Sequence, residues 1–173
     1  MSDNRPTWET TWFTEAETMA RRGTCLRRNS GAKIVSPDND LISSGYTGAP
    51  RGTPNCCDIG KCYRNEMNIP SGARYELCRS VHAEMNAIAQ AGRERILNAS
   101  RDGKKCDMYL VTLDKKTGER IDAYSCLLCK RVIINSGIGR VIAYTRSGTK
   151  IYLVSDWIEE AKKDPFAELN LGR

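Results

Sequence analysis

The chain has 173 residues, of which 40% are hydrophobic and 28% charged, as in a soluble globular protein with one substantial core. No run of 18 apolar residues occurs, and residues 1–14 lack the basic-then-apolar pattern of a secretory signal, so we expect a cytoplasmic protein with no membrane partner. The formal net charge of +6 comes from scattered basic pairs rather than one stripe, which argues against nucleic acid as a partner.

Hydrophobic periodicity and turn residues predict the first elements in chain order. Residues 7–22 are predicted to form an amphipathic helix, because their large apolar side chains recur at helical spacing. A hairpin of strands at residues 32–36 and 41–46 follows. Residues 48–72 are rich in Gly, Pro and Cys and form a loop so long that it needs an internal organiser.

The remainder of the chain alternates between helical and strand patterns. Helices are predicted over residues 81–91, 127–136 and 156–163, and strands over 107–113, 119–123, 140–144 and 150–154. A tight turn at Ser147-Gly148 makes the last strand antiparallel to its neighbour. This order predicts an α/β fold, with a mixed, about five-stranded sheet covered by helices on both faces, and a single domain over residues 1–173.

Cysteine and histidine usage points to a metal. The chain has eight cysteines and one histidine, and so many cysteines in a cytosolic chain favour metal binding over disulfides. His82-Ala83-Glu84 begins one predicted helix, and Cys126-Leu127-Leu128-Cys129 begins another about 40 residues later. Each fragment alone is a weak signal, but their combination is typical of zinc-dependent deaminases.

The spacing of these residues has physical reasons. Cys126 and Cys129 share one face of a helix, whose N-terminus favours their thiolate forms. With His82 they make three zinc ligands and leave the fourth tetrahedral position for water. Glu84 is then predicted to move protons between that water and a cytosine ring. A structural Cys2His site, with Glu84 as an ordinary first-turn acid, is the alternative, but it lacks a fourth ligand.

Further segments extend the motif in both directions. They are Cys25-Leu26-Arg27-Arg28, Gly31-Ala32-Lys33-Ile34-Val35, Gly45-Tyr46-Thr47-Gly48-Ala49-Pro50 and Val81-His82-Ala83-Glu84-Met85-Asn86-Ala87-Ile88. In this order, with the later cysteine pair, they resemble the deoxycytidylate (dCMP) deaminase family. The resemblance implies a cytidine deaminase-like α/β/α sandwich, hydrolysis of dCMP to dUMP and a homo-hexamer. It also implies, as in many members, activation by dCTP and inhibition by dTTP with magnesium.

The chain departs from the family pattern at three places. Thr47 stands where the family usually has an asparagine that contacts the sugar, which puts sugar recognition in doubt. Ser125 replaces the proline before the first metal cysteine, and serine is a good N-cap. Residues 114–125 are an extra hairpin, which forms either part of the pocket wall or a surface insertion.

The sequence also offers candidate residues for contacts with the substrate. Arg27, Arg28, Arg79 and Arg93 are candidates for the phosphate, with solvated or interface arginines as the alternative for each. Tyr124 precedes the metal cysteines and either stacks on the base or packs against the protein.

A second, structural zinc is also predicted. The resemblance includes some phage members in which a cysteine at the position of Cys25 and the first cysteine of an Asn-Cys-Cys-Asp run hold a second zinc. Their other ligands are histidines, which this chain lacks, so we expect Cys25, Cys56, Cys62 and Cys78, with Cys57 as the substitute. The net −2 charge of such a site would be offset by basic residues, namely Arg27, Lys61, Arg64 or Arg79. Buried cysteines without metal are the alternative.

Two other functions are compatible with the sequence. One is deamination of another substrate, namely a nucleoside, a cytosine triphosphate or a tRNA adenosine. The other is a zinc-binding interaction protein with a lapsed active site, against which the intact Glu84 argues.

Overall fold

The computed structural model describes residues 4–163. The helices are α1 (Trp8–Arg21), α2 (Cys56–Ile59), α3 (Tyr63–Glu66), the 3-10 turn η1 (Tyr75–Leu77), α4 (Ala83–Ala91), α5 (Arg93–Asn98), α6 (Leu127–Ser136) and α7 (Val154–Lys163). The strands are β1 (Arg28–Val35), β2 (Leu41–Tyr46), β3 (Asp107–Asp114), β4 (Arg120–Ile121), β5 (Arg140–Thr145) and β6 (Gly148–Leu153). Among residues 4–163, none of the helices has the length and apolarity that a membrane span requires.

The strands form one mixed sheet. The order along its main path is β2-β1-β3-β5-β6, and β4 pairs with β3 beyond the end of β5. Only the β3–β5 pair is parallel among the strands described, and β5 and β6 form an antiparallel hairpin. The predicted mixed α/β sheet is therefore confirmed, with β4 as a sixth, two-residue strand.

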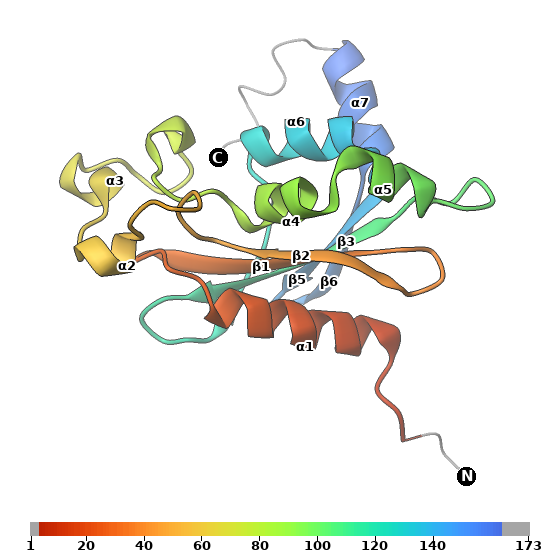
Figure 1. The fold of residues 1–173 in the computed structure, drawn as a ribbon, viewed down its shortest axis with the longest axis horizontal. Coiled ribbons are helices and arrows are strands. Elements are labelled where there is room, and N and C mark those ends of the chain that lie inside the picture. The colour runs from red at the N-terminus through yellow and green to blue at the C-terminus, as the bar shows by residue number, and fades with distance from the viewer. Residues whose placement is uncertain (1–3, 164–173) are drawn as a thin grey trace.

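Helices cover both faces of the sheet, which gives the expected three layers (Figure 1). On one face α1 packs against β1 and β3 and buries Trp12, Phe13 and Ala16. On the other face α4 packs against β2 and β1, and α6 lies beside α4. Each face has its own apolar cluster, so the sheet separates two cores.

Two glycines allow the helices to approach the sheet this closely. A Cβ atom on Gly31 would lie 1.9 Å from the carbonyl oxygen of Ala16 in α1. A Cβ atom on Gly45 would lie 2.3 Å from the carbonyl oxygen of Ala83 and 2.4 Å from the backbone nitrogen of Ala87 in α4. Because α4 carries the first residues of the candidate site, Gly45 helps to set the position of that site.

Replacing Gly45 tests this close approach. We expect Gly45→Ala to lower the free energy of unfolding by about 1–3 kcal/mol, since backbone atoms of α4 must move to admit the methyl group. Urea denaturation measures the change, and Ser44→Ala at the neighbouring, partly exposed position is the control. Equal stability of the two variants would contradict the tight packing of α4 on β2.

The structure differs from the sequence prediction mainly between the long elements. The loop predicted over residues 48–72 contains α2 and α3. Reciprocal hydrogen bonds between Asn55 and Asp58 cap the N-terminus of α2. Neither α5 nor η1 was predicted, because each is too short to show a period. The predicted strand at residues 119–123 pairs only over Arg120–Ile121.

Candidate active site

Two helix N-termini build the site. His82 is the N-cap residue of α4, and Cys126 is the N-cap residue of α6, where Ser125 had been expected. The N-cap expectation for Ser125 is wrong, because α6 begins at Leu127, as predicted, and Cys126 takes the position directly before it. Asn86 ties α4 to the sheet, because its side-chain nitrogen donates to the carbonyl oxygen of Tyr46 over 2.8 Å.

His82, Cys126 and Cys129 converge as predicted. Their ligand atoms all lie within 4.8 Å of one another. Nδ1 of His82 is 3.4 Å from Sγ of Cys126 and 3.3 Å from Sγ of Cys129. Zinc bonds to nitrogen and sulfur at tetrahedral angles would put such atoms about 3.5 Å apart. This donor set therefore fits a zinc ion with three protein ligands.

The three residues influence one another's pKa values strongly. Burial lowers the pKa of His82, but hydrogen bonds with Cys126 and Cys78 outweigh it and raise that pKa to about 10. A hydrogen bond from Cys129, assisted by His82, lowers the pKa of Cys126 to about 4. A hydrogen bond with Cys126 and burial raise the pKa of Cys129, so without a metal the three side chains share protons among themselves. A metal ion requires the same deprotonated sulfur.

Glu84 lies beside the three candidate ligands. Only 4% of its surface is exposed, and it sits in the first turn of α4. Burial raises the pKa of its carboxyl group, and the neighbouring charge of His82 partly opposes this. A buried carboxyl group whose pKa is raised above its ordinary value holds a proton more readily than an exposed one, which suits a proton shuttle.

One cavity joins most of the predicted site residues. Its wall includes His82, Glu84 and Cys126 together with four of the predicted substrate-binding residues, namely Arg27, Arg28, Thr47 and Tyr124. Arg93 is not part of this wall; it begins α5, and its Nε atom donates to the carbonyl oxygen of Asn135. Arg79, the remaining phosphate candidate, also lines the cavity.

Sequence reasoning missed the part of the cavity that comes from irregular backbone. The ring of Tyr75 lies edge-on to the ring of His82, with 5.0 Å between their centroids. Arg64 is 95% buried, given its relative exposure of 5%, and its guanidinium lies 4.6 Å from the centroid of the Tyr75 ring. From the sequence, Arg64 is expected only to offset the charge of the second zinc site. A lone aromatic in a Gly- and Pro-rich segment carries no periodic signal that could have marked it.

The cysteines of the predicted second site share this cavity. Cys25, Cys56, Cys62 and Cys78 all line it, and the first, third and fourth influence the pKa of Cys56, which burial raises. Within residues 4–163, however, His82, Cys126 and Cys129 are the only group of three or more His, Cys, Asp or Glu residues whose ligand atoms lie within 4.8 Å of one another. The expected substitute, Cys57, is exposed and hydrogen-bonds to Asp58.

Known proteins place the chain in a family. Residues 6–145 match the model of the cytidine and deoxycytidylate deaminase zinc-binding region. The chain belongs to this deaminase family. His82, Cys126 and Cys129 lie within the matched zinc-binding region, so zinc is the metal that this group fits.

Individual relatives are similar over most of the chain. A deoxycytidylate deaminase of Schizosaccharomyces pombe is 33% identical over 82% of this chain and 38% of its own length. A Saccharomyces cerevisiae deoxycytidylate deaminase is 32% identical over 83% of this chain and 39% of its own length. This chain therefore spans about two fifths of those two relatives. A deoxycytidylate deaminase of Mycobacterium phage D29 is 29% identical over 80% of this chain and 95% of its own.

A solved structure is also similar. The dCMP deaminase of cyanophage S-TIM5 in apo form is 19% identical, with a TM-score of 0.49 over 79% of this chain and 82% of that one.

Proposed function

We propose that this protein hydrolyses dCMP to dUMP and ammonia. The observation that carries the proposal is the buried Glu84 carboxyl group beside the His82, Cys126 and Cys129 ligand set, at the wall of a cavity rich in arginine. Three ligands leave a zinc coordination position open, which distinguishes catalytic from structural zinc sites. The names of the relatives, which are deoxycytidylate deaminases, support this substrate.

Each residue has a defined role in the proposed reaction. His82, Cys126 and Cys129 would hold zinc, which when bound supplies the Lewis acidity that makes water nucleophilic near neutral pH. Glu84 accepts a proton from the attacking water and delivers it to N3 of the cytosine ring as the oxygen bonds to C4. Glu84 then transfers the remaining hydroxyl proton to the amino group, and the C4–N bond breaks to release ammonia.

The substrate contacts follow from the cavity wall. Arg27 and Arg28 are proposed to bind the phosphate, because guanidinium groups are suited to phosphate oxygens. Tyr124 is proposed to stack on the base, and Thr47 to lie near the sugar. Arg93 stays a weaker candidate, since its hydrogen bond is to Asn135, away from the cavity wall.

An ammonia-release assay tests the proposal. It compares dCMP with deoxycytidine, dCTP and a tRNA containing the target adenosine. We expect the largest kcat/KM for dCMP. A larger value for another compound would reassign the substrate. No turnover of any of them by the zinc-loaded protein would favour a zinc-binding interaction protein with a lapsed site.

Thr47 provides a test of sugar recognition. Its hydroxyl accepts a hydrogen bond from the backbone nitrogen of Ser30 over 3.0 Å, and this occupies part of its bonding capacity. We expect dCMP to be preferred over CMP, and Thr47→Asn to sharpen the preference by on the order of fivefold, the value of one hydrogen bond. Competition kinetics with both nucleotides measures the ratio of kcat/KM for dCMP to kcat/KM for CMP. Equal values for dCMP and CMP in the unchanged protein would contradict the preference.

We also propose a second, structural zinc held by Cys25, Cys56, Cys62 and Cys78. Support comes from their shared cavity wall and from the electrostatic effect of the other three on Cys56. Four thiolates make a closed zinc site, so the sulfurs would draw together around the ion. Burial raises the pKa of Cys78, but a hydrogen bond with His82 and, to a smaller extent, the charge of Arg64 lower it overall, and the Arg64 charge would offset part of the negative charge of the site.

The remaining proposals concern the whole protein. We propose a single domain over residues 1–173, of which residues 1–3 and 164–173 lie outside the described structure. We further propose a cytoplasmic homo-hexamer regulated by dCTP and dTTP with magnesium, on the strength of the family resemblance alone. Sedimentation with and without these nucleotides would test the assembly and the regulation together.

A further inference from the structure

The segment between β3 and α6 contributes to the active-site cavity. Its outer turn, residues 115–119, is largely exposed, whereas Asp122 and Tyr124 line the cavity that also contains Glu84. The extra hairpin of this chain is thus part of the pocket wall at its inner end. It leads directly to Cys126, a candidate zinc ligand.

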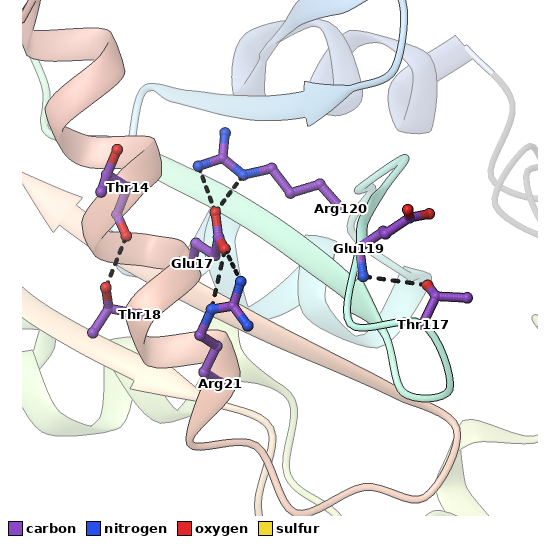
Figure 2. Close-up of polar contacts among 7 residues, drawn as sticks. All are labelled: Thr14, Glu17, Thr18, Arg21, Thr117, Glu119 and Arg120. Atoms are coloured by element: carbon purple, nitrogen blue, oxygen red, sulfur yellow. Dashed lines mark hydrogen bonds and ion pairs between the residues drawn. The ribbon is translucent and has the colours of Figure 1, made fainter.

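An ion pair joins the base of this hairpin to the first helix. Figure 2 shows Glu17 of α1 between Arg120 and Arg21. One carboxylate oxygen, Oε2, accepts hydrogen bonds from Nε and Nη2 of Arg120, each over 2.6 Å. The other oxygen, Oε1, accepts from Arg21. Glu17 and Arg120 are 103 residues apart in sequence, so the pair is a tertiary contact.

Partial burial makes the pair with Arg120 stronger than the pair with Arg21. The side chain of Arg120 is 28% exposed, and its guanidinium lies 5.1 Å from the centroid of the Tyr144 ring. The side chain of Arg21 is 61% exposed, where an ion pair contributes little. Burial of Glu17 acts to raise its pKa, but the hydrogen bonds from both arginines lower it overall. Glu17 is therefore held as a carboxylate.

Each of the three residues after Arg120 is paired or hydrogen-bonded with a neighbouring strand or with the turn that follows β5. Ile121 pairs with Thr112 of β3. The Asp122 carboxylate accepts a hydrogen bond from the backbone nitrogen of Arg146 over 2.8 Å, and the backbone nitrogen of Ala123 donates to the carbonyl oxygen of Tyr144 over 2.9 Å. Because β4 has only two residues, the ladder alone holds this segment weakly, and the ion pair with α1 adds a side-chain attachment to these backbone contacts.

We propose that Arg120, paired with Glu17, is a positioning residue that sets Asp122 and Tyr124 on the wall of the nucleotide cavity. A carboxylate repels phosphate and accepts hydrogen bonds from hydroxyl or amino groups. Because Asp122 lines the same cavity as Arg27 and Arg28, its negative charge would keep the phosphate on the side of the two arginines. The proposal rests on the proposed function, because it predicts an effect on dCMP affinity.

The experiment compares variants on the two sides of Glu17 in the full-length, zinc-loaded protein. We expect Arg120→Ala to raise KM for dCMP roughly tenfold, since small displacements of positioning groups have effects of this size. We expect kcat within about twofold of the unchanged protein and the same zinc content. Arg120→Lys, which keeps the charge but not the two-nitrogen contact, should give an intermediate KM, and it also serves if the alanine variant fails to fold. Arg21→Ala removes the other cation from the same carboxylate and should leave KM within about twofold.

The outcomes separate this proposal from the proposed function. A lowered melting temperature with KM unchanged in both Arg120 variants would overturn the positioning role and leave only a structural one. If the unchanged protein does not act on dCMP, the proposed function fails. Amide hydrogen exchange over residues 121–125 then decides the inference alone: faster exchange in Arg120→Ala than in Arg21→Ala supports it, and equal exchange overturns it.

Discussion

Glu84→Gln is expected to lose nearly all turnover while it keeps the fold and the zinc. The amide has the same shape as the carboxyl group but cannot accept and release a proton. General acid–base catalysis contributes roughly 10²–10⁴-fold, and Glu84 is proposed to serve several steps, so we expect a loss at the upper end of this range. Steady-state rates of ammonia release from dCMP, together with zinc analysis, measure both quantities.

A neighbouring acid provides the control for this variant. Glu94 lies in the first turn of α5, as Glu84 does in α4, but it is exposed and does not line the cavity. Glu94→Gln should leave turnover unchanged. Turnover of Glu84→Gln within about tenfold of the unchanged protein would refute the proton-shuttle assignment.

Cys25→Ser is expected to reduce the zinc content from close to two ions per chain to one and to destabilise the fold. Structural zinc sites contribute on the order of 10 kcal/mol in small zinc-binding peptides, and the segment they would organise here has little apolar core. Metal analysis and thermal denaturation measure the two effects. The zinc at His82 should stay in place, because none of its ligands changes.

Cys57→Ser is the matched control for that experiment. Cys57 is exposed and lies next to Cys56 in α2, so its replacement should change neither the zinc content nor the stability. A content near one zinc ion in the unchanged protein would rule out the second site and leave Cys25, Cys56, Cys62 and Cys78 as free thiols.

The long elements and the metal ligands were predictable from sequence because each carries a local signal. The apolar period of residues 8–21 is visible without any partner, and β2 was predicted with the bounds it has. His82, Glu84 and the two later cysteines were found because their chemistry demands fixed spacings at helix starts. Their convergence then follows because β2 and β3 are both antiparallel to β1 and so run in the same direction, and α4 and α6, which come after these strands in the chain, lie side by side on one face of the sheet.

The irregular wall of the cavity was not predictable in the same way. Tyr75 contacts His82 from a loop that Arg64 holds, with hydrogen bonds from its Nη2 to the carbonyl oxygens of Pro70 and Ala73. The pair of Arg120 with Glu17 likewise depends on two segments far apart in sequence. Such contacts are set by tertiary packing, and no period or motif in the chain encodes them.

The two helix starts that meet at His82 and Cys126 have a consequence for the unfolded chain. These residues are 44 positions apart, so an ion bound to both is a cross-link that closes a long loop. In the unfolded chain these ligands are far apart and the site is not formed, so an ion that binds only the folded chain stabilises it, by roughly 4 kcal/mol when the free ion is about a thousandfold above its dissociation constant. Zinc bound between the two helix starts would thus add to the free energy of unfolding.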